Sequence, residues 1–154
     1  MGFNESVDIA RVGERVVRDY LDDLDTTKAV IDIRHDTRFM GKDIDFMVYT
    51  TKKQIYYVEV KTDFKAHETG NMVYEVHTSG EKGCLAKTEA DYIFYYVYGS
   101  KTLYVIDRIK LQSYVNSFKH LKLIKMGDRS DGYLLPLSVL EEHKVVVKKV
   151  TNLD

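Results

Sequence analysis

Hydrophobic side chains recur every three or four residues along the first part of the chain and every second residue soon afterwards. The first spacing places the apolar side chains on one face of a helix, so it predicts an amphipathic helix over residues 4–24. Asn4 or Ser6 is suited to cap its start. The apolar stripe consists of Ile9, Val12, Val16, Val17, Tyr20, Leu21 and Leu24.

Runs of β-branched and aromatic residues follow and predict strands. The second and third runs, residues 44–49 and 55–61, are separated by five polar residues, which is typical of a hairpin. Within the third run, Glu59 and Lys61 lie on the opposite face from Val58 and Val60. The remaining runs predict strands over 29–33, 72–77, 91–98, 103–106, 121–125, 133–137 and 145–150, one or two helical turns within 81–90, and a helix over 107–118 capped by Asp107.

These elements predict a mixed α/β fold in which a central mixed β-sheet is flanked by helices. Residues 91–98 are apolar on both faces, as expected for a central strand that is covered on two sides. The chain has one proline and no linker-like stretch, so residues 1–154 are expected to form a single domain. The inward side of the helix over 107–118 is expected to carry Ile109, Leu111, Tyr114, Val115 and Phe118.

The composition narrows the class of protein. Apolar residues make up 44% of the chain and charged residues 31%, which allows a packed core. No apolar run approaches the ~20 residues of a membrane span, the N-terminus is unlike a signal peptide, and Cys84 is the single cysteine. A cytoplasmic location is therefore expected, without a disulfide or a multi-cysteine zinc site.

The net charge of −1 argues against a protein that coats nucleic acid through bulk electrostatics. A nucleic-acid partner would need a local basic patch. Six lysines are expected near the site discussed next: Lys52, Lys53, Lys61, Lys65, Lys82 and Lys87.

The predicted hairpin brings Asp45 back beside Glu59, with Lys61 two residues further along the same face. Two carboxylates this close repel each other unless a cation lies between them, and oxygen ligands suit Mg²⁺ or Mn²⁺. The Lys61 ammonium can hold a phosphate or position a water molecule. Together these groups indicate metal-assisted hydrolysis of a phosphodiester. The alternative is an ordinary hairpin with a solvated face.

The residues Asp45-Phe-Met-Val and Glu59-Val-Lys61, preceded by a helix that carries Glu14, resemble the PD-(D/E)XK nuclease superfamily. This restriction-endonuclease-like fold includes archaeal-type Holliday junction resolvases, and its αβββαβ core fits the predicted order of elements. The resemblance implies a metal-dependent DNase in which Asp45 and Glu59 bind Mg²⁺ or Mn²⁺. Lys61 would assist the nucleophilic water, and Glu14 would reach the site from the first helix.

The sequence leaves several assignments open. Ile44 stands where the family name has proline, which leaves Asp43 as a rival to Asp45. Glu14 has Arg18 four residues later as a plain ion-pair partner. Glu75 on the strand over 72–77 and Lys87 before the central strand are auxiliary candidates, for the metal and for a scissile phosphate respectively.

The expected function is a small Mg²⁺-dependent endonuclease that acts on DNA, of a structure-specific, repair or phage type. A restriction or homing endonuclease, an RNA-directed nuclease, and a catalytically silent DNA-binding or assembly subunit are the alternatives. Because one chain presents one active site, a homodimer is expected for cutting both strands. The helix over 107–119, or the strand over 91–98 with its hairpin partner, is the expected interface.

Overall fold

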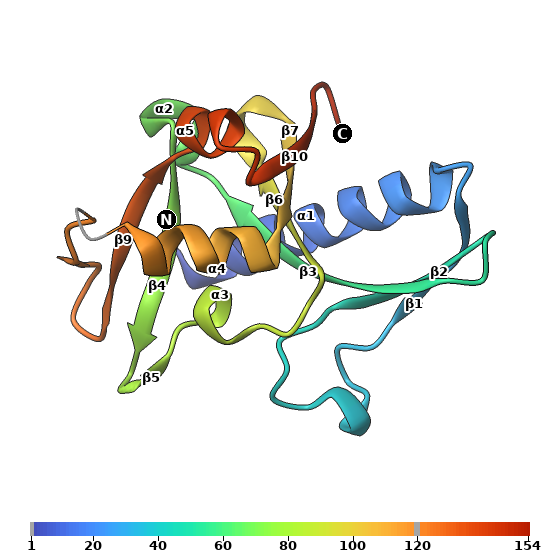
Figure 1. Ribbon diagram of the computed structural model, residues 1–154, viewed down its shortest axis with the longest axis horizontal. Coiled ribbons are helices and arrows are strands. Elements are labelled where there is room, and N and C mark those ends of the chain that lie inside the picture. Colours follow the sequence, from blue (N-terminus) through green and yellow to red (C-terminus); the bar gives the residue numbers. More distant parts are fainter. Residues whose placement is uncertain (1, 119–120) are drawn as a thin grey trace.

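The computed structural model describes residues 2–118 and 121–154, and it is a mixed α+β fold (Figure 1). The chain opens with the predicted amphipathic helix, α1 (Phe3–Asp23), which buries Val16, Val17 and Leu21. Neither Asn4 nor Ser6 caps it. Gly2 occupies the N-cap position, and its backbone N–H donates to the Glu5 carboxylate at 3.0 Å.

A six-stranded sheet forms the centre of the molecule, with strand order β1-β2-β3-β6-β7-β10. The strand β3 pairs in parallel with β6, and every other neighbouring pair in this sheet is antiparallel. The predicted β2–β3 hairpin is therefore confirmed. The strands are β1 (Thr27–Asp32), β2 (Phe46–Thr50), β3 (Ile55–Asp63), β6 (Tyr92–Val97), β7 (Thr102–Asp107) and β10 (Val146–Val150).

A second, four-stranded antiparallel sheet has the order β5-β4-β9-β8. The predicted central mixed sheet is confirmed, but the sequence did not predict this second sheet, in which β4 (Asn71–Thr78) pairs with β9 (Ser130–Pro136). Met72 and Tyr74 on β4 pack into the core beside residues of β6. The two short edge strands are β5 (Glu81–Lys82) and β8 (Ile124–Lys125).

Short helices join and cover these sheets: α2 (Ala66–Thr69), α3 (Cys84–Lys87), α4 (Arg108–Ser117), α5 (Leu137–Glu142), and the 3₁₀ turns η1 (Thr37–Phe39) and η2 (Tyr98–Ser100). Asp107 caps α4 as predicted, with its carboxylate accepting from the Lys110 N–H at 2.9 Å. Ile109 was expected to face inward but is 65% exposed. The sequence did not predict α5, because its leucines continue the apolar run of the preceding strand.

The central strand β6 is buried on both faces, as predicted. Phe94 and Tyr96 pack on the α1 side, whereas Ile93 and Tyr95 pack on the side of the second sheet. Because β6 and its hairpin partner β7 are both interior strands of this sheet, neither has a free edge for pairing with a second subunit. Residue 119, at the end of the other suggested interface helix, lies outside the described residues.

Side chains alternate between the two faces of β3, and this alternation determines the environment of the candidate site. Val58 and Val60 belong to the core beneath α1. Glu59 and Lys61 therefore point to the opposite face, toward α3 and the second sheet. Among the described residues, no helix is long and apolar enough to cross a membrane.

Candidate active site

The β2–β3 hairpin brings Asp45 against the strand that carries Glu59. Phe46 pairs with Val58, and the Asp45 N–H donates to the Val58 carbonyl at 2.9 Å, so Asp45 lies one step further along the same ladder. Its carboxylate oxygen Oδ2 accepts from the Val60 N–H at 2.7 Å. The structure thus brings together the two carboxylates that the sequence paired.

Glu59 is buried among polar neighbours, with 5% of its surface exposed. The Lys61 ammonium lies 3.4 Å from Glu59 Oε1, and the Cys84 thiol donates to the same oxygen at 3.0 Å. Glu59 is therefore shielded from solvent, which contradicts the interpretation of this residue as part of an ordinary exposed hairpin face.

Burial controls the electrostatics of this cluster. It raises the pKa of Glu59 to about 8, with the nearby Asp45 carboxylate adding to the rise. Burial also raises the pKa of Asp45, against the opposing effect of the hydrogen bond from Val60. A buried carboxyl pair of this kind is costly when both members are charged. Added positive charge would relieve that cost.

The neighbouring lysine and cysteine are held in defined protonation states. Burial alone would lower the pKa of Lys61, but Cys84 and Glu59 outweigh it and the pKa rises. Burial raises the pKa of the Cys84 thiol to about 12. At neutral pH the lysine is therefore a cation and the cysteine a neutral donor.

Glu14 lies on α1 near this cluster but is bound elsewhere. Its carboxylate forms an ion pair with Arg34. The same arginine donates a hydrogen bond from Nε to Asp32 Oδ1 at 3.0 Å. The suggested partner Arg18 instead lies 3.8 Å from Asp22. Glu14 is still close enough to contribute to the raised pKa of Asp45.

The other candidates lie around the site without joining it. Asp43 has a positive φ of 50° and pairs with Lys87, whose ammonium is 3.5 Å from its carboxylate. Both of these side chains thus have a structural partner. Glu75 accepts a hydrogen bond from the Thr78 hydroxyl on β4, in the second sheet.

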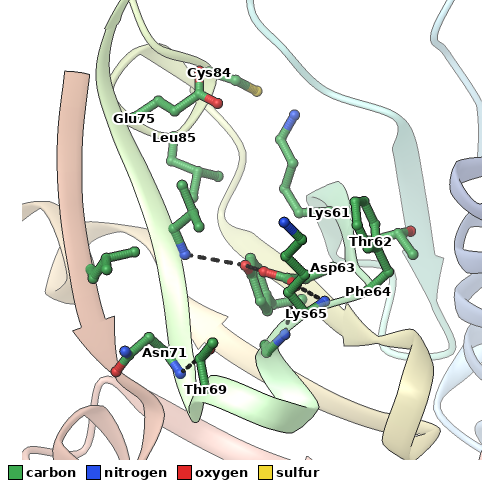
Figure 2. A pocket seen from close by; sticks show the side chains of 14 residues that line it. Lys61, Thr62, Asp63, Phe64, Lys65, Thr69, Asn71, Glu75, Cys84 and Leu85 are labelled. Atoms are coloured by element: carbon green, nitrogen blue, oxygen red, sulfur yellow. Dashed lines mark hydrogen bonds between the residues drawn. The ribbon is translucent and has the colours of Figure 1, made fainter. Parts of the chain in front are cut away.

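A cavity of about 470 Å³ adjoins the cluster at Lys61 and Cys84 (Figure 2). It lies between the end of β3, the strand β4 and the helix α3. Of the six lysines expected around the site, Lys61 and Lys65 line this cavity. Lys52 and Lys53 were expected near the site but lie in the β2–β3 turn, at the opposite end of β3. The pattern of charges along the chain does not show in which direction this turn projects.

The sequence did not reveal the role of Cys84, which it marked only as a poor nucleophile. The thiol reaches Glu59 because α3 packs closely against β4, and Gly83 permits this approach. A Cβ at Gly83 would lie 2.1 Å from the Glu75 carbonyl. The glycine immediately before the cysteine was the available signal, but its meaning depends on the position of β4.

The comparisons with known proteins give no match. No family model matches the chain, and neither a curated protein nor a solved structure matches it.

Proposed function

We propose that this protein is a divalent-metal-dependent nuclease that hydrolyses phosphodiester bonds in DNA. The observation that carries the proposal is the cluster of Asp45, Glu59 and Lys61, in which Glu59 is buried and Lys61 reaches the wall of a cavity. Carboxyl groups with raised pKa values beside a charged partner cluster at functional sites, and Asp45 and Glu59 are two such groups.

The donor set of this cluster fits Mg²⁺ or Mn²⁺. Asp45 Oδ1 and Glu59 Oε2 accept no hydrogen bond within the described parts of the chain, so each carboxylate keeps one oxygen for a cation. Residues 2–118 and 121–154 contain no group of three or more His, Cys, Asp or Glu side chains placed to hold a metal ion. Magnesium commonly uses one or two carboxylates together with water and substrate phosphate, so binding is expected to be weak until DNA is present.

When bound, the metal would supply Lewis acidity toward the phosphate and a more acidic water molecule. Lys61 is placed to donate to a phosphate oxygen and to stabilise the negative charge that develops on it. Cys84 holds Glu59 Oε1 through its S–H group and so fixes the direction of the other oxygen. The backbone N–H of Val60 does the same for Asp45.

A second candidate function has its own support. Glu59 already receives a hydrogen bond from Cys84 and an ion pair from Lys61, and its pKa of about 8 leaves it mostly protonated at neutral pH. Such a site can exist without a metal, which favours a catalytically silent DNA-binding or assembly subunit. A cleavage assay distinguishes the two functions.

The experiment is a panel of plasmid, branched and single-stranded DNA, with an RNA counterpart, incubated with Mg²⁺, Mn²⁺ or EDTA. We expect metal-stimulated cleavage of DNA by the wild type and none by Lys61→Ala. The matched control is Lys53→Ala, an exposed lysine at the far end of β3. The silent-subunit function is favoured if the wild type binds DNA but cleaves none of it under any condition.

The proposal includes assembly as a homodimer for cutting both strands. Ile109 on α4 is 65% exposed and Phe118 at the end of that helix is 38% exposed, so this helix is the remaining candidate interface. Light scattering of the free protein and of its duplex complex tests the assembly. A monomer in both states that still makes double-strand breaks contradicts it.

A further inference from the structure

The cavity beside the catalytic cluster lies between the two sheets. The strand β3 contributes Lys61, which Figure 2 labels, β4 contributes Val73, and β9 contributes Leu134. Along β4, alternate residues divide between two environments: Val73 lines the cavity, while Met72 and Tyr74 are buried in the core. One wall is therefore a regular strand face.

Hydrogen bonds between the sheets hold these walls together. The hydroxyl of Tyr95, on β6, accepts from the Val73 N–H at 3.2 Å and donates to the Asp63 carboxylate. The other oxygen of Asp63 accepts from the N–H groups of Lys65 at 2.7 Å and Ala66 at 2.8 Å. The cavity is thus pre-formed, as ligand sites usually are.

The chemistry of the walls separates into apolar and cationic parts. Val73, Leu85 and Leu134 supply apolar surface, and Phe64 supplies an aromatic ring. The ammonium of Lys65 lies 5.9 Å from the centre of that ring and forms no ion pair with the described residues. Polar groups mark the two ends in Figure 2, with Thr69 and Asn71 at one and Glu75 with Cys84 at the other.

The acidic groups of the cavity are already bound internally. Asp63 accepts three hydrogen bonds, and Glu75 accepts one from Thr78. The cations are Lys61, at the catalytic cluster, and Lys65. A ligand with negatively charged groups can therefore bind along the two lysines while a flat, apolar part of the same ligand enters the cavity between the sheets.

We propose that this cavity receives one unpaired DNA base next to the scissile phosphate, which makes DNA with a single-stranded or bulged nucleotide the preferred substrate. This inference rests on the proposed function. A volume of about 470 Å³ is in the range of pockets that bury a small ligand, and it is too small to admit a duplex.

The physical reasons favour a base that is already unpaired. Extruding a nucleotide from a duplex costs stacking and pairing energy, and the cost is least for a base without a partner. A π-face can then stack on Phe64 independently of sequence, while the two lysines contact the flanking phosphates. The expected selectivity is therefore for DNA structure rather than for sequence.

The test compares three DNA duplexes by fluorescence anisotropy in Ca²⁺. One duplex carries a single-nucleotide bulge, the second carries the same bulge with an abasic residue, and the third is fully paired. The wild type should bind the first about tenfold more tightly than the second, which is the scale of base–aromatic stacking. Phe64→Ala and the cavity-filling Val73→Phe should reduce that ratio toward one. Phe3→Ala, an aromatic side chain that is 83% exposed outside the cavity, should keep it.

Cleavage of the same duplexes in Mg²⁺ separates this inference from the proposed function. Equal binding and cutting of the base-bearing and abasic bulges by the wild type overturns the base pocket while the nuclease stands. Base-dependent binding without cleavage supports the pocket and overturns the nuclease. A ratio that survives both Phe64→Ala and Val73→Phe, in variants that melt like the wild type, places the base elsewhere and also overturns the inference.

Discussion

Two neighbouring clusters in this protein contain the same kinds of charged group, but carboxyl pKa values are shifted in opposite directions in the two. The inner cluster consists of Asp45, Glu59 and Lys61, and the outer cluster of Glu14, Asp32 and Arg34. Each contains two carboxylates and one cation. In the inner cluster the pKa of both carboxyls is raised, whereas in the outer cluster the pKa of Asp32 is lowered.

The difference comes from burial and from the shape of the cation. Arg34 presents a planar fork that reaches both of its carboxylates, and the outer cluster is partly exposed to solvent. Lys61 is a point charge that reaches Glu59, which is buried. The outer cluster is therefore electrostatically satisfied, while the inner one has excess negative charge whenever both carboxyls ionise. This uncompensated negative charge indicates where a metal cation would bind favourably.

The largest expected effect is on cleavage. Asp45→Asn, Glu59→Gln and Lys61→Ala should each reduce metal-dependent cleavage by at least about 100-fold, because under the proposed function each removes a group that acts on the metal or the phosphate. Asp32→Asn should stay within a few fold of the wild type. Single-turnover rates on the preferred DNA measure both.

Asp43→Asn is the matched control for Asp45→Asn. Asparagine tolerates the positive φ at this position, so the loop geometry is kept while the ion pair with Lys87 is lost. We expect most of the activity to remain. An inactive Asp43→Asn beside an active Asp45→Asn would show that the assignment of the carboxylate is wrong.

The next effect is on stability as a function of pH, in EDTA. The pKa of Glu59 is about 8 in the folded protein and 4.5 in its ordinary state, so between these values the folded state holds a proton that the unfolded state has lost. The free energy of unfolding should therefore fall as pH rises through this window. Each pKa unit corresponds to about 1.4 kcal/mol, which gives a total of a few kcal/mol.

Glu59→Gln removes the titrating group and should flatten this part of the curve. Denaturant unfolding of both proteins from pH 5.5 to 8.5 measures the difference. The free energy of unfolding of Glu59→Gln should increase relative to that of the wild type as the pH rises. Parallel curves would mean that Glu59 ionises normally and that the inner cluster is not electrostatically strained.

A bound metal ion should offset part of the destabilisation that the two ionised carboxylates of the inner cluster cause. A cation that binds only the folded state, at ten times its dissociation constant, contributes about 1.4 kcal/mol and raises Tm by roughly 3–6 °C. The gain with Mn²⁺ should be larger at pH 8.5 than at pH 6.5, since metal and proton compete for Glu59. Thermal melts with and without a short duplex measure it. Glu59→Gln should lose the response and Asp32→Asn should keep it, so an equal gain in all three proteins places the ion elsewhere.

The longer helices, the strands of the central sheet and the inner cluster could be predicted from sequence, because their signals are local. The spacing of α1 and the five-residue turn between β2 and β3 depend on neighbouring residues, and together they place Asp45 beside Glu59. The alternation of β3 then puts Glu59 and Lys61 on one face. What the sequence did not show is that this face is covered.

The segments that cover this face of β3 are held there by contacts between residues that are far apart in the sequence. The strand β4 could pair with β3 or with β9 by propensity alone, and the choice was made by packing of Met72 and Tyr74 against the core. Cys84 joins Glu59 across 25 residues, and Arg34 joins Glu14 across 20. Neither spacing corresponds to a turn or to a helical repeat, so neither contact has a sequence signature.

The smallest expected effect belongs to the outer cluster, and its sign is opposite to that of Glu59. Arg34 lowers the pKa of Asp32 from its ordinary value of 3.8, first through their side-chain hydrogen bonds. A carboxyl of this kind stabilises the folded state above its ordinary pKa, and that stability is lost as the pH falls through the lower folded value. Asp32→Asn should therefore be less stable than the wild type at pH 7 by at most about 1 kcal/mol, as for other partly exposed ion pairs. The gap should narrow toward pH 3 and shrink in high salt. Paired unfolding curves at both pH values, each with and without added salt, measure it. A gap that widens as the pH falls would contradict the sign, and with it the contrast between the two clusters.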